Sequence, residues 1–518
     1  MSPLPLAQIE TVNPLASTDP LLKRQPPRPP HLREPSYLDN FDSDTIIYDA
    51  YWVQSQVVLI CPPLLNLEEP LLHALRESLG ERIEIKVHNL DRTARILLTG
   101  VSPSQETIEL HLNNKLYKLT ITKDRNQIFR NKRVLFTKSK NNNLKWIRDW
   151  AEFYVVNHNV DALLLYDNGS TEYSITDIAD QLDIPKLESA IIVDWPFKFG
   201  PQGGTWTGTE PRPWDSDYCE YSIIEHARHK YLAESSVVIL HDIDELLITE
   251  DNRTIDDHLD DCSADYLTYR GVWVDDYTLK STETPRFQDF FFIDKIGEPT
   301  TKKWIAETHR IAKADQWKTH GVEGAAAESS VMLKHRHFKG ITTDWKWKRS
   351  GTANRRKPRH MVDTLLIAAM NAAFGESGET TPPGAAYKAS KPEVQQQFLN
   401  DVRTEIDPDR WLPLGMVKSW YWRPNVLVFD FEMQNNVRIA FEIRLESGKL
   451  WLIATGRNET SIQLLQSTIG AETSHFNDSQ KHWTISWWRM YTSAHEIAKD
   501  CLFQITGLAT RLRDHKTL

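Results

Sequence analysis

The stretch Val237-Val-Ile-Leu-His-Asp242-Ile-Asp244-Glu245 decides the fold class that this sequence predicts. Four consecutive apolar residues are typical of a strand buried on both faces of a sheet, and two aspartates follow where that strand ends. In extended backbone, residues two apart share a face, so Asp242 and Asp244 lie roughly 6.5 Å apart along the chain. Ligands of open α/β sheets bind beyond the carboxyl ends of the strands, so this position favours a binding site over a turn or helix cap.

Three further apolar runs precede this stretch, namely 134–136, 162–166 and 189–193. Residues 143–158 separate the first two, and their apolar side chains recur at the spacing of one helical face. A second helix is expected from 217 to 233. Continuous apolar strands that alternate with helices predict an α/β fold with a largely parallel sheet covered on both faces.

The regions on either side of this pattern have a different composition and periodicity. We therefore expect the chain to consist of four parts. Residues 1–40 are rich in proline and polar residues, and we expect a disordered arm there. Residues 41–130 alternate apolar and polar residues in short runs, which predicts a β-rich accessory domain of antiparallel strands. Residues 131–350 hold the α/β pattern, and residues 351–518 predict an α+β accessory domain.

Composition excludes several classes of protein. The 518 residues are 40% hydrophobic and 25% charged, which is typical of a soluble globular chain. No apolar run is long enough to span a membrane and no secretory signal is evident, so we expect a cytoplasmic protein whose only membrane contact would be peripheral. The net charge of −10 argues against a nucleic-acid partner. Four cysteines without a paired spacing predict neither a disulfide framework nor a cysteine metal site.

Two other groups of polar residues are candidates for a site. Asp167 and Asn168 follow an apolar run in the sequence Tyr166-Asp-Asn-Gly-Ser170, where an ordinary turn is an equally good interpretation. His335 and His337 share a face if they lie on a strand. One of them could bind a metal or a phosphate, and a structural role is at least as good an interpretation.

Basic residues interleaved with tryptophan form a third group, represented by Lys302, Lys346 and Arg349. Such cations could bind the phosphates of a cofactor or donor and neutralise a departing diphosphate. A solvated basic face and an RNA-binding patch are the alternatives.

Taken in order, these motifs resemble the GT-A glycosyltransferases, in particular the family 92-like and family 2-like group. The matching segments are Asn143-Leu-Lys-Trp-Ile-Arg-Asp-Trp150, Tyr166-Asp-Asn-Gly-Ser170, Leu240-His-Asp-Ile-Asp-Glu-Leu246 and His337-Phe-Lys339. The resemblance covers roughly residues 131–350 and implies a Rossmann-like mixed-sheet core. It further implies a hexosyltransferase, for example in polysaccharide biosynthesis, that uses a nucleotide-sugar donor, a glycan or other hydroxyl acceptor, and Mn²⁺ or Mg²⁺.

The resemblance also implies roles for individual residues. Asp242 and Asp244 would hold the metal and the donor, and His337 would complete the metal shell. Asp167 would contact the nucleoside, with Asn168 beside it. The chain departs from the family pattern at His241 and Leu246, which bears on donor preference.

Catalysis would involve Asp244, and an inverting transfer also requires a carboxylate base near the acceptor hydroxyl. Asp276 and Glu307 are the candidates for this base, and Asp275 is a further one. Two other functions stay open: a non-catalytic module that binds nucleotide sugars within an assembly, and, less favoured by the net charge, a nucleic-acid-binding protein.

Overall fold

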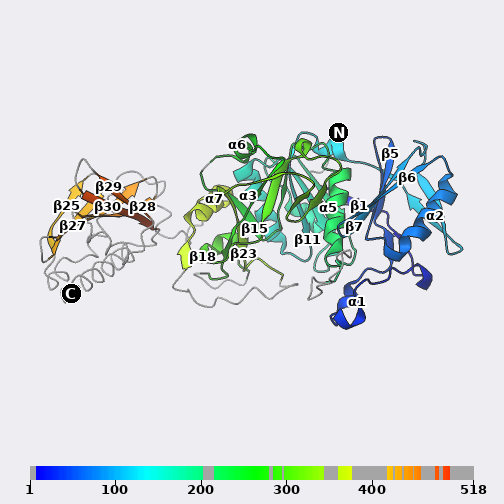
Figure 1. Cartoon of the computed structure of the whole chain (residues 1–518), viewed down its shortest axis with the longest axis horizontal. Coiled ribbons are helices and arrows are strands. Elements are labelled where there is room, and N and C mark those ends of the chain that lie inside the picture. The colour runs from blue at the N-terminus through cyan, green and yellow to red at the C-terminus, as the bar shows by residue number, and fades with distance from the viewer. Residues whose placement is uncertain are drawn as a thin grey trace. The chain divides into compact units, whose positions relative to one another are not determined.

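The computed structural model describes residues 7–201, 215–251, 253–278, 284–294, 297–343 and 360–375, together with the backbone of six strands between 417 and 489 (Figure 1). Contacts divide the chain into two compact units, of which the first comprises Met1–Phe290, Ile296–Lys357 and Ala372–Phe374. The expected α/β class is confirmed, with several mixed sheets. Among the described helices, none is both long enough and apolar enough to cross a membrane.

An eight-stranded sheet in the order β1-β13-β12-β11-β14-β19-β16-β22 forms the centre of the first unit. The strands from β1 to β14 run parallel, while β19 is antiparallel to both β14 and β16. Every residue of β12 is buried, as expected for an apolar strand covered on both faces. The strands are β1 (Ala7–Thr11), β11 (Arg133–Ser139), β12 (Ala162–Asp167), β13 (Ser189–Asp194), β14 (Val237–Leu240), β16 (Tyr266–Tyr269), β19 (Lys303–Glu307) and β22 (Ala327–Ser329).

The order of these strands creates a reversal between β11 and β14. The chain adds β12 and β13 on one side of β11 and then places β14 on the other side. At such a reversal the connections leave in opposite directions, so a crevice opens at the carboxyl ends of the two strands. Phe136 of β11 pairs with Leu240 of β14, so Lys138 and Asp242, each two residues further on, reach the crevice at the same level.

Helix α3 (Leu144–His158) forms where the periodicity predicts it. The Asn143 side chain accepts a hydrogen bond from the Lys145 amide and caps the helix, and Asn159 ends it in a left-handed conformation. The residues of the predicted apolar face are all buried, namely Ile147, Trp150, Ala151, Tyr154 and Val155. Tyr154 of this face donates a hydrogen bond to the Glu245 carbonyl after β14, and the helix contacts β15 (Glu245–Thr249) and α4 (Ile175–Gln181).

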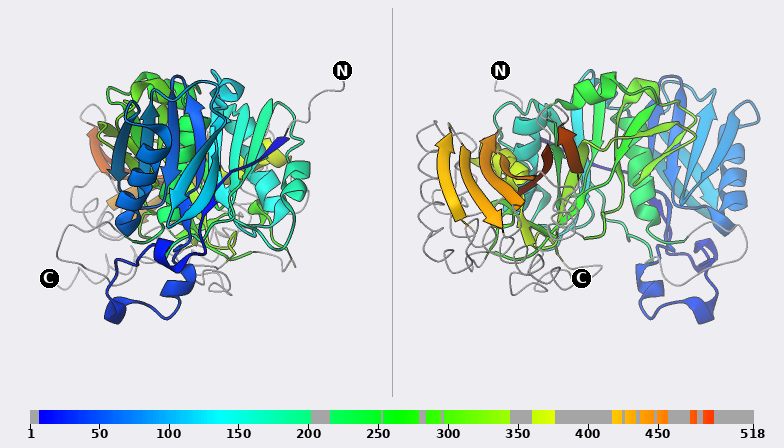
Figure 2. Two further views of the ribbon diagram at one scale, coloured as in Figure 1. Left: turned by 90° about the vertical axis from the view of Figure 1, so that its right-hand side faces the viewer. Right: turned by 60° about the vertical axis from the view of Figure 1, so that its left-hand side comes forward.

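A second, five-stranded sheet lies in the N-terminal part, in the order β10-β4-β5-β7-β6. Its strands pair antiparallel as expected, except that β10 runs parallel to β4. Helix α2 (Glu68–Leu79) lies along this sheet (Figure 2). Its buried leucines belong to the hydrophobic core of the sheet. The elements are β4 (Asp49–Val53), β5 (Gln56–Cys61), β6 (Glu84–Leu90), β7 (Thr93–Thr99), β10 (Thr122–Lys123) and the hairpin β8 (Thr107–Leu112)–β9 (Lys115–Thr120).

Helix α5 (Tyr218–Lys230) lies between the two sheets and joins them into one compact unit. All of its residues except His229 are buried, although the sequence is polar. Each buried charge has a partner: Arg95 of β7 pairs with Glu225, and Asp49 of β4 accepts from Lys230 at 2.7 Å and from His226 at 2.9 Å. Residues of β4 and β5 contribute to the buried cluster of the larger sheet, and the five-stranded sheet has a second cluster of its own, so the domain boundary expected near residue 130 stays a prediction.

The expectation of a disordered arm is wrong for residues 7–40. Strand β1 pairs with the edge strand β13, from Ala7 beside Ala190 to Thr11 beside Asp194. Further along, Arg28 is buried against Asp215 at 2.7 Å, and the Tyr37 hydroxyl donates to the same carboxylate at 2.7 Å. Backbone pairing and the contacts of buried arginines keep this segment folded. The low apolar content of the segment reveals neither interaction.

Several shorter elements complete the first unit. The strand β15 follows the Asp242–Asp244 motif directly and pairs antiparallel with β23, which is parallel to β17. These elements are β15 (Glu245–Thr249), β17 (Val272–Val274), β23 (Leu333–Phe338), α1 (Tyr37–Asn40), α4 (Ile175–Gln181), α6 (Ile255–Asp260), and the pairs β2 (Leu15–Ala16)–β3 (Thr45–Ile47) and β20 (Gln316–Lys318)–β21 (Gly321–Glu323).

The second unit contains a six-stranded antiparallel sheet in the order β25-β26-β27-β28-β30-β29. The strands expected between 426 and 454 are confirmed. Strand β18 (Phe292–Asp294) pairs antiparallel with β24 (His360–Val362), and helix α7 (Thr364–Phe374) follows β24. The sheet strands are β25 (Val417–Arg423), β26 (Val426–Met433), β27 (Val437–Glu446), β28 (Lys449–Gly456), β29 (Thr473–Asn477) and β30 (His482–Arg489).

Candidate functional site

A cleft of about 590 Å³ opens at the carboxyl ends of β11 and β14, at the reversal of strand order. Its volume lies within the range typical of small-molecule sites, about 300–1,000 Å³. The strand ends contribute Lys138, Asn168 and the segment Asp242–Glu245, and β19 contributes Lys303. His337 lies on β23 and lines the same cleft.

Asp242 is held between two lysines. Its Oδ1 accepts from Lys138 Nζ at 2.9 Å and its Oδ2 from Lys303 Nζ at 2.6 Å. Burial alone would raise the pKa of Asp242, but the two ammonium groups outweigh it and hold the pKa well below its usual range. Lys138 also pairs with Glu220 of α5 at 2.6 Å. Asp242 is therefore a permanent anion with a cation on each oxygen.

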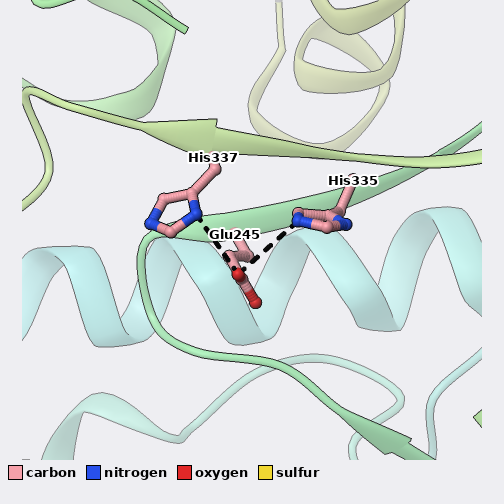
Figure 3. Close-up of side chains that lie close together, drawn as sticks. All are labelled: Glu245, His335 and His337. Carbon is pink, nitrogen blue, oxygen red and sulfur yellow. Dashed lines mark ion pairs between the residues drawn. The ribbon is translucent and has the colours of Figure 1, made fainter. Parts of the chain in front are cut away.

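Asp244, Glu245 and His337 meet because β15 and β23 pair in a specific register, with Glu245 opposite His337. His337 Nε2 lies 3.0 Å from Asp244 Oδ2, and its Nδ1 lies 3.4 Å from Glu245 Oε1 (Figure 3). His335 Nε2 lies 3.7 Å from the same Glu245 oxygen. The three side chains of Glu245, His335 and His337 bring potential ligand atoms within 4.8 Å of one another.

His241, which immediately precedes Asp242, fixes the position of the segment Asp242–Glu245 through its buried hydrogen bonds. It is fully buried, its Nδ1 hydrogen-bonds the Tyr154 hydroxyl of α3, and its Nε2 lies 2.7 Å from the Tyr269 hydroxyl. The Tyr154 hydroxyl also accepts from the Leu247 amide at 3.0 Å. The departure from the family pattern at this position thus has a structural role in holding the acidic segment.

We expect stability to fall as the pH drops from about 6.5 toward 4. Burial lowers the pKa of His158, His226 and His335 to about 4 in the folded chain. Between about pH 6.5 and about pH 4 the unfolded chain binds a proton at each of these histidines, whereas the folded chain does not. Each histidine therefore lowers the free energy of unfolding by about 1.4 kcal/mol for each pH unit of acidification in this range. Urea unfolding at pH 7.5 and pH 5.0 measures this loss. Equal unfolding free energies at the two pH values would contradict the buried neutral state of these rings.

The predicted nucleoside residues differ from each other in position. Asn168 lines the cleft, and its amide donates to the carbonyls of Trp195 at 2.9 Å and Phe197 at 2.8 Å. Asp167 is not among the cleft-lining residues, and its carboxylate accepts from the Ser170 amide at 3.0 Å and from the Ser170 hydroxyl. In the structure the Asp167 side chain therefore forms hydrogen bonds within the turn, as the turn interpretation of this motif predicted.

Other predicted residues lie elsewhere. Glu307 pairs with Val237 at the amino end of β14, so it lies at the opposite edge of the sheet and does not belong to this site. Lys302 does not line the cleft, whereas Lys303 does, because successive strand residues point to opposite faces. Asp276 is half-buried and outside the cleft lining. Lys346 and Arg349 fall outside the described residues.

Sequence reasoning assigned no role to four residues that the structure brings into this site. Lys138 ends the strand β11, so the rule that singled out Asp242 could have found it. Lys303 begins a strand that starts at the crevice and runs antiparallel to β14, and no local pattern reveals this pairing. These residues are Lys138, Glu220, Glu245 and Lys303, whereas His335 was one of two histidines expected as a possible metal or phosphate ligand, and it lies against Glu245.

Comparisons with known proteins add little. No protein-family model matches the chain, and no curated protein matches it. Solved structures that align with it include S. aureus TarS 1–349 at 12% identity, over 59% of this chain and 98% of that chain, with a TM-score of 0.23. The same fragment in complex with UDP-GlcNAc aligns with a TM-score of 0.25, and S. aureus TarS aligns over 69% of this chain and 72% of that chain with a TM-score of 0.23. Similarity at such low TM-scores carries no argument about this chain.

Proposed function

We propose that the chain is a metal-dependent glycosyltransferase of the GT-A type that moves a hexosyl group from a nucleotide-sugar donor to a glycan or other hydroxyl acceptor. One observation carries this proposal: the carboxyl ends of β11 and β14, at the reversal of strand order, and the start of β19 bring Asp242, Asp244, Lys138 and Lys303 into one cleft. Crevices of this kind receive nucleotides and related ligands in open α/β sheets. The ordered motifs that resemble GT-A enzymes lie around the same cleft.

The charges of the cleft support a requirement for a cation. Four carboxylates lie together, those of Glu220, Asp242, Asp244 and Glu245, and two ammonium groups, those of Lys138 and Lys303, face them. With neutral histidines the group carries a net charge of −2. A donor diphosphate is also anionic, so it would be repelled unless a divalent cation offset the carboxylates.

The chain's own residues fit such a cation, which as Mn²⁺ or Mg²⁺ would supply positive charge to the departing diphosphate. The resemblance assigns Asp242, Asp244 and His337 to it. Lys138 and Lys303 orient Asp242 and add fixed positive charge near the diphosphate, where charge grows as the glycosidic bond breaks. Asp276 stays the candidate base for an inverting transfer, and its distance from the cleft lining requires that an acceptor reach beyond the cleft.

The test is a screen of the common nucleotide diphosphates by thermal unfolding, with and without Mn²⁺, followed by donor hydrolysis. We expect one nucleotide to stabilise the full chain only when the cation is present, by about 2.7 kcal/mol at a concentration of 100 times Kd. Sugar release from the matching donor should accompany this binding.

Two outcomes would contradict the proposal in different ways. Cation-dependent binding without any turnover, with a broad set of acceptors supplied, would favour the non-catalytic binding module. Absence of binding by every nucleotide tested would remove the donor site altogether.

A further inference from the structure

We propose that Glu245, His335 and His337 form the cation site and that they select a transition-metal ion such as Mn²⁺, Co²⁺ or Zn²⁺ over Mg²⁺. This inference deepens the proposed function, on which the catalytic meaning of the ion rests, but it concerns where the ion binds. It differs from the set Asp242, Asp244 and His337 that the resemblance implies.

The pairing of two strands builds this triad. Glu245 begins β15 and lies opposite His337 on β23, while His335 lies two residues earlier on β23 and so shares the face of His337. Figure 3 shows the Glu245 carboxylate between the two imidazoles. The Glu245 and His335 side chains are only 2% and 0% exposed, whereas His337 lines the cleft together with Glu245. An ion held by the triad would therefore face the cleft from its floor.

The two separations between Glu245 and the imidazoles fit ligands around one ion. Glu245 Oε1 lies 3.4 Å from His337 Nδ1 and 3.7 Å from His335 Nε2. These distances exceed those of ordinary hydrogen bonds, which end near 3.2 Å. Donors that each lie about 2.1 Å from an ion at a tetrahedral angle are about 3.4 Å apart. The Glu245 carboxylate is thus spaced from each imidazole as one metal ligand is from the next, and all three ligand atoms lie within 4.8 Å of one another.

The surroundings orient the triad as an outer shell would. His337 presents its other ring nitrogen, Nε2, to Asp244 Oδ2 at 3.0 Å, the carboxylate–histidine arrangement that aims an imidazole at a metal. Glu245 Oε2 accepts from Lys303 at 2.9 Å and from the Asp242 amide at 3.1 Å, so Oε1 faces the imidazoles. His335 Nε2 also lies 2.7 Å from Thr300 Oγ1, a contact that an ion would replace or share.

Asp242 is poorly placed to act as a ligand in the same structure. Each of its carboxylate oxygens lies within 3 Å of a lysine ammonium group, Oδ1 with Lys138 and Oδ2 with Lys303. An ion on either oxygen would therefore have to compete with a lysine ammonium group that already lies against it. The three acidic residues of the motif therefore have different roles: Asp242 pairs with the lysines, Asp244 orients His337, and Glu245 binds the ion.

The donor set also indicates the class of ion. Two imidazoles and one carboxylate suit transition-metal ions, whereas Mg²⁺ prefers an octahedral shell of oxygens and retains its water. We therefore expect a large excess of Mg²⁺ to compete weakly against Co²⁺ or Mn²⁺ at this site.

The experiment uses the full chain and Co²⁺ alone, with no nucleotide present. X-ray absorption at the cobalt edge counts imidazole ligands on the unaltered protein, and visible absorption gives the affinity. We expect one bound Co²⁺ with two imidazoles. His335→Gln and Glu245→Gln should each lower the Co²⁺ affinity by at least about tenfold, whereas Asp242→Asn should keep it within about threefold.

The opposite pattern would overturn the assignment. A single imidazole on Co²⁺, together with affinity lost in Asp242→Asn and kept in His335→Gln, would return the ion to Asp242, Asp244 and His337. Absence of Co²⁺ binding would also refute the site. If His335→Gln does not fold, as circular dichroism would show, the imidazole count on the unaltered chain still decides. Two-imidazole binding without nucleotide binding would refute the proposed function while leaving this site intact.

Discussion

Asp244→Asn is expected to lower donor turnover by about 100-fold or more while the protein stays folded. The side chain of Asp244 is 16% exposed at the cleft and is not part of an apolar core, so the substitution leaves the packing unchanged. It removes a negative charge that faces His337 Nε2 at 3.0 Å and that the proposed cation needs nearby. Loss of a preorganised group at a site of developing charge costs about 10²–10³ in kcat. Donor hydrolysis and circular dichroism on the same samples measure the two effects.

Glu307→Gln is the matched control for this prediction. It also removes one carboxylate from the chain, but at the opposite edge of the sheet, where Glu307 pairs with Arg310. We expect its turnover to equal that of the unaltered protein. Full activity of Asp244→Asn would refute the proposed mechanism, and loss of activity in Glu307→Gln would refute the placement of the site.

Glu225→Ala is expected to lower the free energy of unfolding by about 3–5 kcal/mol, because it leaves Arg95 buried without its partner. The side chains of Glu225 and Arg95 are 0% and 5% exposed and connect α5 to β7. Burial acts to raise the pKa of Glu225, but His229 and Arg95 outweigh it and hold the pKa at about 2. The carboxylate is therefore charged at every physiological pH. Denaturant unfolding measures the loss, which should exceed that of most single substitutions.

Two further variants test the reason for this loss. Asp261→Ala removes an exposed pair with Arg253, whose side chains are 68% and 44% exposed, and should cost no more than about 1 kcal/mol. Replacement of both buried partners, Arg95→Met with Glu225→Leu, should recover most of the stability, since no buried charge then lacks a partner. A double variant as unstable as Glu225→Ala would show that packing, rather than the uncompensated charge, sets the cost.

Local patterns predicted the elements that border the cleft. The apolar runs became β11, β12, β13 and β14, and the periodic face of residues 144–158 became the buried face of α3. These predictions hold because strand and helix periodicity reflect burial of one residue after another along the chain. The same reasoning placed Asp242 and Asp244 beyond a strand end, where the cleft lies.

Where the structure differs from the sequence-based expectations, the cause is pairing between segments that lie far apart in the chain. Residues 7–40 were expected to be disordered because composition does not reveal the interactions that stabilise them. These interactions are the pairing of β1 with β13 and the buried contact of Arg28 with Asp215. Lys302 and Glu307 were chosen by residue type alone. The register of β19 against β14 decides that Lys303 reaches the cleft and that Glu307 lies at the far edge.

The amino-acid sequence by itself determined the α/β class, the strands that end at the cleft and the acidic motif between β14 and β15, because each depends on neighbours within a few residues. Only the tertiary structure decided which charges meet there. Lys138, Lys303, His335 and Glu245 come from separate elements, and a shift of one residue in strand register would turn each side chain to the other face. The chemistry of the cleft is therefore set by pairings between distant segments, whose free energy no local pattern in the chain contains.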